Sequence, residues 1–474
     1  MDKESFVTEM ARAVAEGSAA IFAGAGLSTG AGFVDWRGLI RPLATELGLN
    51  IDRESDLTAV AQYYVNVHCG NRARINKLVL NSFTEGTKAS PALQILARLP
   101  IATYWTTNYD TTIETELKNK HKLVDVKRNS ASLATNIQSP DAVVYKMHGD
   151  VSDISEVILT KDDYETYDQK RLLFKVALQS DLLTKTFLFI GFSFEDPNFA
   201  NVLTQMRILL EESAPVHYCF LKKITKKDGE SLEDFKSHEE KQRLQILELK
   251  RYGIETILLT DYVEIPKLLK EIYRAVRTRQ IFISGSIADY PANWPQTKVE
   301  YFCSLLGEKL VEQNYYVTSG FGFGIGSAVV NGALKAIYDH NLSREHLMLR
   351  PFPQPTLSPK KSMRDLWTRY RQEMIEPTGI DIFVFGNKEQ EGRVVAAEGV
   401  KQEYEIAKKD SSRTLLPLPS TGMVAKKLYD EDKDEIITNF NLSDKEVAKL
   451  ETCTDPETLV NLVVQLVARR TRIK

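Results

Sequence analysis

The amino-acid sequence predicts an α/β protein made of two successive domains, each built on a parallel sheet. Short runs of apolar, β-branched and aromatic residues alternate with longer segments of helical periodicity, which is typical of parallel α/β folds. This alternation begins again after residue 278, with glycine-rich turns of its own. A chain of 474 residues is also longer than one ordinary core supports. We therefore expect domains over residues 1–278 and 279–474.

The expected elements begin with a helix. Phe6, Met10 and Val14 recur at the i, i+4, i+8 spacing of one helix face, and Gly17 is a suitable stop. Buried strands are expected after it, over 19–23, 101–107, 143–147, 187–192, 217–221 and 254–259. The charged segment 222–251 is interpreted as a solvent-exposed helix with its flanking loop, and a further helix is expected over 265–276. Strands of the second domain are expected over 281–284, 315–318, 346–349, 381–385 and 414–418.

The composition excludes several classes of function. Hydrophobic residues make up 43% of the chain, charged residues make up 26%, and the formal net charge is −3. This balance argues against nucleic acid or an anionic membrane as the main partner. The four cysteines form no CxxC pair and no Cys/His cluster, so neither a zinc site nor a disulfide framework is expected. We find no apolar run of 18 residues and no secretory pattern at the N-terminus, and we expect a cytoplasmic protein.

A glycine-rich turn follows the first expected strand. Residues 24–32 read GAGLSTGAG. Glycines at this place let the backbone approach a pyrophosphate, and the N-terminus of the next helix offers free N–H groups and the positive end of its dipole. Such a turn is weak evidence by itself. Its position directly after the first strand favours a nucleotide site.

Four more segments accompany this turn. Residues 35–37 read DWR, and TTNYD at 106–110, KMHGD at 146–150 and GFSFEDPN at 191–198 each lie at the end of an expected strand. In an open parallel sheet, ligands bind at the carboxyl ends of the strands. We therefore expect these segments to converge on one crevice.

Together these segments resemble the sirtuin family, in order and rough spacing, over most of residues 1–275. The resemblance implies a Rossmann-like domain whose substrate is NAD+. It implies that Asn108 and Asp110 contact the nicotinamide-side ribose and position a water, and that His148 is the general base at the ribose hydroxyls. An imidazole suits that role because it can take up a proton at cellular pH. The phosphates and the adenosine half would be held by Gly24, Ala25, Gly26, Ser28, Gly191 and Ser193.

One departure from the sirtuin pattern bears on the reaction. Sirtuin deacylases carry a zinc module held by two CxxC pairs, and this sequence contains no such pair. The acyl-lysine groove that the module helps to form is therefore in doubt, and water becomes the simplest acceptor of the ADP-ribosyl group. We expect NAD+ hydrolysis, with no metal and no further cofactor. Protein deacylation and non-catalytic nucleotide sensing are the alternatives.

The second domain contains two strand–turn segments of its own. Residues 281–286 read IFISGS, and residues 318–327 read TSGFGFGIGS. They resemble the SLOG nucleotide-sensing domains, which are also Rossmann-like. A sirtuin-like domain followed by a SLOG domain resembles the NAD-hydrolysing effectors of bacterial Thoeris anti-phage defence. RPFPQ at 350–354 and GNK at 386–388 extend this resemblance over essentially the whole chain.

The resemblance to these effectors implies a signal and an assembly. In that family a TIR-domain partner enzyme makes a cyclic ADP-ribose isomer, which binds the SLOG domain and switches on NAD+ depletion by a homotetramer or larger assembly. Arg371 and Lys388 would neutralise the pyrophosphate of this ligand. Phe352 would stack on the adenine, and Glu403 would accept the ribose hydroxyls. The remaining residues implied for this pocket are Gly285, Ser286, Phe323 and Gly399.

Overall fold

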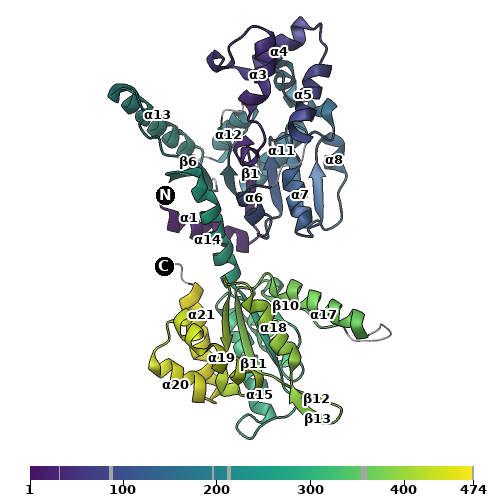
Figure 1. Cartoon of the computed structure of the whole chain (residues 1–474), viewed down its shortest axis with the longest axis vertical. Coiled ribbons are helices and arrows are strands. Elements are labelled where there is room, and N and C mark those ends of the chain that lie inside the picture. The colour runs from purple at the N-terminus through teal and green to yellow at the C-terminus, as the bar shows by residue number, and fades with distance from the viewer. Residues whose placement is uncertain (31, 85–88, 195–196, 211–214, 354–359, 472–474) are drawn as a thin grey trace. The chain divides into compact units, whose positions relative to one another are not determined.

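The computed structural model describes residues 1–30, 32–84, 89–194, 197–210, 215–353 and 360–471. Contacts within the chain divide it into two compact units, unit 1 over residues 1–273 and unit 2 over residues 274–474 (Figure 1). The division falls inside helix α14 (Ile265–Thr278), whereas the sequence places it at the end of this helix. The two units are therefore joined by a continuous helix.

Unit 1 contains a seven-stranded parallel sheet in the order β3-β4-β2-β1-β5-β6-β7. β1 lies in the middle and pairs with β2 on one side and β5 on the other, so the strand order reverses at this point. Ligands bind at such a switch point of an open α/β sheet. The strands are β1 (Ala19–Ala23), β2 (Thr103–Thr106), β3 (Val124–Lys127), β4 (Ala142–Lys146), β5 (Thr186–Ile190), β6 (His217–Lys222) and β7 (Ile254–Leu259).

Six of these strands are confirmed, with their ends within two residues of the expected ones. β3 is an edge strand that the sequence does not predict, because its run of Val-Asp-Val-Lys lacks an apolar stretch. Its Asp125 and Lys127 are both buried and form an ion pair at 2.8 Å. Tertiary pairing therefore overrides the local polarity of this segment.

The helices of unit 1 cover the sheet, and α3, α4 and α5 gather at one end of it (Figure 1). The first helix is capped by Asp2, whose carboxylate accepts a hydrogen bond at 2.8 Å from the N–H three residues on. Its predicted core positions Phe6, Met10 and Val14 are all buried. The helices are α1 (Lys3–Ala15), α2 (Ala25–Thr29), α3 (Trp36–Glu46), α4 (Leu57–Val67), α5 (Ala73–Thr84), α6 (Pro91–Leu96), α7 (Thr112–Asn119), α8 (Ser130–Ala134), α9 (Lys161–Glu165), α10 (Tyr167–Lys170), α11 (Leu172–Thr184), α12 (Pro197–Leu210), α13 (Leu232–Arg251) and α14.

The charged segment before β7 forms the exposed helix α13, as predicted. It projects away from the strands of unit 1 (Figure 1), and among its residues only Leu249 is buried. Of the helices that the structure describes, none is both long and apolar enough to cross a membrane.

Unit 2 contains a five-stranded parallel sheet in the order β10-β9-β8-β11-β14. β8 lies in the middle between β9 and β11, so the strand order reverses here as well. The five predicted strands are confirmed, although His346 lies in a 3-10 turn just before β10. The antiparallel hairpin β12–β13 is not predicted by the sequence. The strands are β8 (Gln280–Ser286), β9 (Tyr316–Ser319), β10 (Leu347–Leu349), β11 (Ile380–Phe385), β12 (Asn387–Gln390), β13 (Arg393–Ala396) and β14 (Thr414–Pro417).

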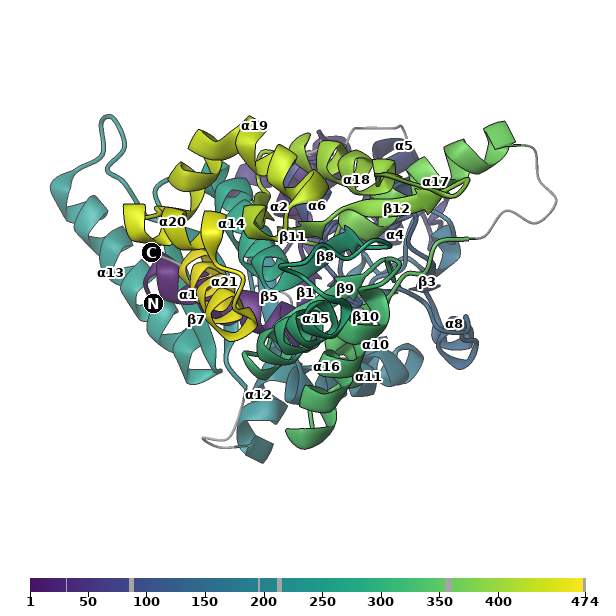
Figure 2. The ribbon, with the colours of Figure 1, turned by 90° about the horizontal axis from the view of Figure 1, so that it is seen from below.

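Helices cover both faces of this sheet. Figure 2 shows α17 and α18 on one side of the strands and α15 and α16 on the other. Two apolar clusters follow this division, one with the side chains of α17 and α18 and one with those of α15, α16 and α21. The helices are α15 (Gln296–Glu312), α16 (Gly326–Asp339), α17 (Lys360–Ile375), α18 (Glu398–Lys408), α19 (Met423–Phe440), α20 (Asp444–Thr452) and α21 (Pro456–Thr471).

Candidate active site and nucleotide pockets

The glycine turn of unit 1 lies at the switch point and packs backbone against backbone. Gly24 N–H donates to the Ile190 carbonyl, and Gly26 N–H donates to the Gly191 carbonyl, both at 2.9 Å. A Cβ on Gly24 would lie 2.3 Å from the Gly191 oxygen, and one on Gly26 would lie 2.7 Å from the Gly191 Cα. Only glycines fit this contact, which leaves the backbone able to approach a ligand.

Asn108 follows β2 and turns toward this glycine turn. Its Nδ2 donates to the Gly24 carbonyl at 2.9 Å and to Ser28 Oγ at 2.7 Å. Its backbone N–H donates to Thr106 Oγ1 at 3.0 Å. The residue is 8% exposed, so these bonds determine how its amide is oriented.

Asp110 belongs to the same network. Its Oδ2 accepts a hydrogen bond from Ser28 Oγ at 2.6 Å, so Ser28 links Asn108 to Asp110. Its Oδ1 accepts from the backbone N–H of Thr112 at 3.0 Å and from the Thr112 hydroxyl. An amide and a carboxylate from the loop after β2 are thus held together beside α2.

A buried ion pair lies behind this network. Lys146 is the last residue of β4, and its Nζ lies 3.2 Å from Glu114 Oε1. The same Nζ donates a hydrogen bond to the backbone carbonyl of Asp110. Lys146 is the first residue of the KMHGD motif, but the sequence alone indicates no role for it.

His148 follows β4 and is completely buried. Its ring makes T-shaped contacts with two tyrosines, with ring centroids 5.5 Å from Tyr164 and 6.2 Å from Tyr167. The next residue, Gly149, has a φ of +72°, and a Cβ there would lie 2.8 Å from the Glu156 carbonyl oxygen. The local backbone therefore requires the glycine of the His-Gly pair.

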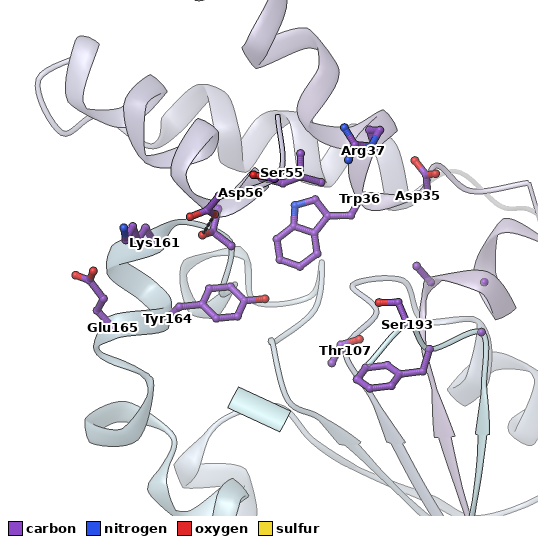
Figure 3. A pocket seen from close by; sticks show the side chains of 16 residues that line it. Asp35, Trp36, Arg37, Ser55, Asp56, Thr107, Lys161, Tyr164, Glu165 and Ser193 are labelled. Carbon is purple, nitrogen blue, oxygen red and sulfur yellow. Dashed lines mark hydrogen bonds between the residues drawn. The ribbon is translucent and has the colours of Figure 1, made fainter. Parts of the chain in front are cut away.

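A cleft of about 790 Å³ opens beside the carboxyl ends of β1, β2 and β5 (Figure 3). Its lining includes four of the predicted NAD-binding residues, namely Ala25, Gly26, Gly191 and Ser193. A smaller recess of about 50 Å³ adjoins it and is lined by Ser28, Asn108 and Asp110 among others. The two spaces share Ala25, Trp36 and Thr107. Gly24 and His148 are the predicted residues that border neither space.

Two aromatic residues face each other across the cleft. Trp36 begins α3 and Tyr164 lies on α9, with ring centroids 6.1 Å apart. Both rings point into the space between their helices in Figure 3. Trp36 borders the cleft and the recess, whereas Tyr164 borders the cleft and contacts His148. Trp36 belongs to the DWR motif, but the sequence alone indicates no role for it. No local sequence pattern identifies Tyr164 as a site residue.

The two predicted turns of unit 2 also pack backbone against backbone. A Cβ on Gly285 would lie 2.4 Å from the Val384 carbonyl oxygen, and one on Gly322 would lie 1.9 Å from the Gly285 oxygen. The N–H of Ile287 donates to the Phe323 carbonyl at 2.8 Å. The Phe323 side chain is 70% exposed.

The end of β8 is tied to the start of the hairpin. Ser286 Oγ donates to the Asn387 carbonyl at 2.8 Å, and the Asn387 side chain accepts from the Ala288 N–H at 2.6 Å. Asn387 is buried, while Lys388 beside it is partly exposed. The predicted residue Ser286 is thus bonded to the residue that precedes the predicted Lys388. Asn387 provides this link between the end of β8 and the hairpin. The sequence alone gives Asn387 no role beyond its place in the GNK motif.

The other four predicted signal residues form one cluster. Arg371 Cζ lies 4.7 Å from the centroid of the Phe352 ring, and Arg371 Nε lies 3.3 Å from Glu403 Oε1. Glu403 Oε2 also accepts from Ser284 Oγ at 2.6 Å. A Cβ on Gly399 would lie 3.0 Å from Arg371 Nη2. Burial raises the pKa of the Glu403 carboxyl above its usual value, against the opposing effects of Ser284 and Arg371.

Comparison with known proteins agrees with this two-part organisation. Residues 264–470 match the Sir2- and TIR-associating SLOG family, and residues 102–257 match the SIR2-like domain. The chain is 41% identical over 471 residues to the NAD(+) hydrolase ThsA of Bacillus cereus (strain MSX-D12), covering 98% of both chains. It is 40% identical over 480 residues to the NAD(+) hydrolase ThsA of Enterococcus faecium, covering 98% of this chain and 99% of that one. The chain belongs to the ThsA family.

Similarity to the ThsA family extends over both units, whereas a more distant relative matches less of the chain. Defense-associated sirtuin 2 of Bacillus subtilis is 29% identical over 216 residues, which is 44% of this chain and 21% of that one. The predicted fold class, a sirtuin-like Rossmann domain followed by a SLOG domain, is confirmed. Parts of the quoted motifs lie outside the described residues, namely Ala31, Glu195, Asp196 and Gln354.

Proposed function

We propose that this member of the ThsA family hydrolyses NAD+ to ADP-ribose and nicotinamide in unit 1. The observation that carries the proposal is the buried network of Asn108, Ser28 and Asp110 against the glycine turn. It places an amide and a carboxylate in a recess beside a cleft whose backbone can receive a pyrophosphate. Relatives that align over nearly the whole chain are named NAD(+) hydrolases, which supports the same reaction here.

In the proposed reaction, NAD+ places its phosphates at the glycine turn and its nicotinamide ribose in the recess. Breaking the glycosidic bond develops positive charge on the ribose, which Asp110 can stabilise while Asn108 orients the attacking water. His148 accepts a proton from a ribose hydroxyl, and that hydroxyl takes up the proton that the water loses as it attacks. Because His148 is buried against Tyr164, whose ring lines the cleft, Tyr164 must move when NAD+ enters. No metal and no further cofactor takes part in these steps.

The proposed activator is a cyclic ADP-ribose isomer bound to unit 2. A guanidinium that lies over a phenyl ring can pair with a pyrophosphate while the ring stacks on adenine, and Arg371 and Phe352 have this arrangement. Ser286 at the end of β8 and Lys388 in β12 supply a hydroxyl and a second cation. The description of this family as TIR-associating supports a TIR-domain enzyme as the source of the ligand.

A row of apolar side chains on unit 1 supports the proposed homotetramer. On α11, Leu172, Leu173 and Val176 are 53%, 54% and 52% exposed. Leu172, Val176 and Leu183 share one helix face. Exposed apolar side chains grouped on one helix are typical of a protein contact, and a second copy of the chain covers them in our proposal. We place this assembly in the cytoplasm and its NAD+ depletion in defence against phage.

Nicotinamide release by the full-length protein tests the proposal. We expect ADP-ribose and nicotinamide in equal amounts, and a higher rate when a cyclic ADP-ribose isomer is added. An acetyl-lysine peptide in the same assay tests the deacylase alternative, which peptide deacetylation coupled to NAD+ consumption would favour. A change of oligomeric state on adding the isomer, without any nicotinamide release, would favour the nucleotide-sensor alternative.

A further inference from the structure

The buried pair of Lys146 and Glu114 does not contribute to the lining of the active-site cleft. The two side chains are 1% and 3% exposed, and neither is among the residues that border the cleft or the recess. Burying two charges is often no more stabilising than burying well-packed apolar side chains of similar size. The stability of the fold is therefore a poor reason for placing a lysine and a glutamate here.

The surroundings of Lys146 indicate a different role. β4 pairs with β2 so that Lys146 stands beside Thr106. The loop after β2 carries both Asn108 and Asp110, and Lys146 Nζ reaches across to donate to the Asp110 carbonyl. Lys146 thus holds the backbone of this loop, and Ser28 holds the side chains of Asn108 and Asp110.

We propose that Lys146 is a positioning residue for NAD+ hydrolysis, which holds the Asp110 carbonyl and thereby places the Asp110 carboxylate and the Asn108 amide in the recess. The inference rests on the proposed function. Glu114 provides the counter-charge that keeps the lysine in the interior, and its carboxylate has no hydrogen-bond donor among the described residues. A reacting group displaced by about 1 Å can lose about hundredfold in rate, so a contact one step from the substrate can control turnover.

Testing this role requires removing both charges together. Lys146→Met alone leaves Glu114 buried without its counter-charge, which is strongly destabilising. Lys146→Met/Glu114→Leu removes the pair with similar side-chain volumes, and we expect a Tm close to that of the parent. We expect kcat to fall by about tenfold to hundredfold and KM for NAD+ to stay within about threefold, because the glycine turn is unchanged. Lys146→Arg keeps the charge and a donor, and should retain more activity than the double variant.

A second buried pair in the same sheet provides the matched control. Lys127 Nζ on β3 lies 2.8 Å from Asp125 Oδ2. The same Nζ donates to the Thr135 carbonyl and not to the loop that carries Asn108 and Asp110. Lys127→Met/Asp125→Leu likewise removes two buried charges. We expect this variant to keep kcat and KM within about twofold of the parent values.

All variants are compared as full-length proteins, by steady-state nicotinamide release from NAD+ with a cyclic ADP-ribose isomer present. A folded Lys146→Met/Glu114→Leu variant that turns over at the parent rate overturns the inference. Equal losses of kcat in both double variants also overturn it, because they would show a general effect of the sheet. A parent chain that releases no nicotinamide overturns the proposed function instead, so the two failures are distinguishable.

Discussion

Arg371 and Glu403 neutralise each other in unit 2, with Nε 3.3 Å from Oε1 and both side chains largely buried. Ser284 fixes the other carboxylate oxygen by a hydrogen bond at 2.6 Å. A pyrophosphate that reaches Arg371 must therefore share or replace the ion pair with Glu403. Its affinity then reflects the difference between the Arg371–pyrophosphate contact and the Arg371–Glu403 contact. Glu403 then becomes available to a ribose hydroxyl. If the proposed ligand binds at this cluster, one that carries both a pyrophosphate and a ribose should bind better than inorganic phosphate.

Removing either proposed catalytic side chain should stop NAD+ cleavage. For His148→Ala and Asn108→Ala we expect kcat to fall by about 10²–10⁴-fold, the usual contribution of a positioned acid–base or orienting group. Both residues follow neighbouring strands of one sheet; Asn108 bonds to the glycine turn, and His148 contacts Tyr164, which lines the cleft. The measurement is nicotinamide release, with Tm as the check on folding. His121 is exposed, so His121→Ala is the control, and full turnover by either catalytic variant removes that residue from the mechanism.

The strands and turns of both units could be predicted because their signals are local. Apolar runs followed by glycines mark the ends of β1, β8 and β9, and the glycine contacts in the structure explain why those residues are required. The positions Asn108, Asp110 and Ser28 were expected in one site, and the structure brings them into one hydrogen-bond network. Motif order along parallel strands was sufficient for this, because carboxyl ends of parallel strands share one edge.

Features that depend on tertiary pairing could not be predicted. β3 is polar, and its place in the sheet follows from pairing with β4. Tyr164 lies on a short helix whose position depends on packing around Trp36. The contact of Lys146 with the Asp110 carbonyl joins residues 36 positions apart in the sequence. No spacing rule connects such residues, since each contact follows from the arrangement of whole elements.

Stability of unit 1 should depend on pH through His217. Burial lowers the pKa of His217 to about 4, and its Nδ1 accepts a hydrogen bond from the Phe187 N–H, which requires that nitrogen to be unprotonated. The unfolded chain binds this proton near pH 6.5 and the folded chain does not, so stability is lost as the pH falls from about 6.5 to 4.

Through His217, acidification from about pH 7.5 to about pH 5 should lower the free energy of unfolding by about 2 kcal/mol. Denaturant unfolding of the parent and His217→Gln at both pH values measures this. The parent should lose about 2 kcal/mol more than the variant on acidification. An equal loss in both proteins would show that another group accounts for the acid sensitivity.

The exposed row on α11 predicts the outcome of charge substitutions. Leu172→Lys/Val176→Lys should give a smaller assembly by light scattering, because two ammonium groups cannot be buried in an apolar contact without partners. Leu244→Lys/Leu247→Lys on α13 is the control, since these leucines are 53% and 51% exposed on a different helix. Unchanged mass in the α11 variant, with the parent an oligomer, would place the contact elsewhere.

Coupling between signal and catalysis is tested at Arg371. A ligand bound there can activate unit 1 only if it binds the active state more tightly than the resting one. Losing a buried charge contact to a pyrophosphate costs about 2–5 kcal/mol, or at least about thirtyfold in affinity. Arg371→Ala should therefore need far more of the isomer to reach the same rate of NAD+ cleavage.

The basal rate of Arg371→Ala is the internal control, because its catalytic residues are intact. It should equal that of the parent, or exceed it if the Arg371–Glu403 pair helps to hold the resting state. A full dose–response of nicotinamide release against the cyclic ADP-ribose isomer gives both the midpoint and the basal rate. An unchanged midpoint would place the sensing site away from Arg371, and the cluster with Glu403 and Phe352 would then have a structural role only.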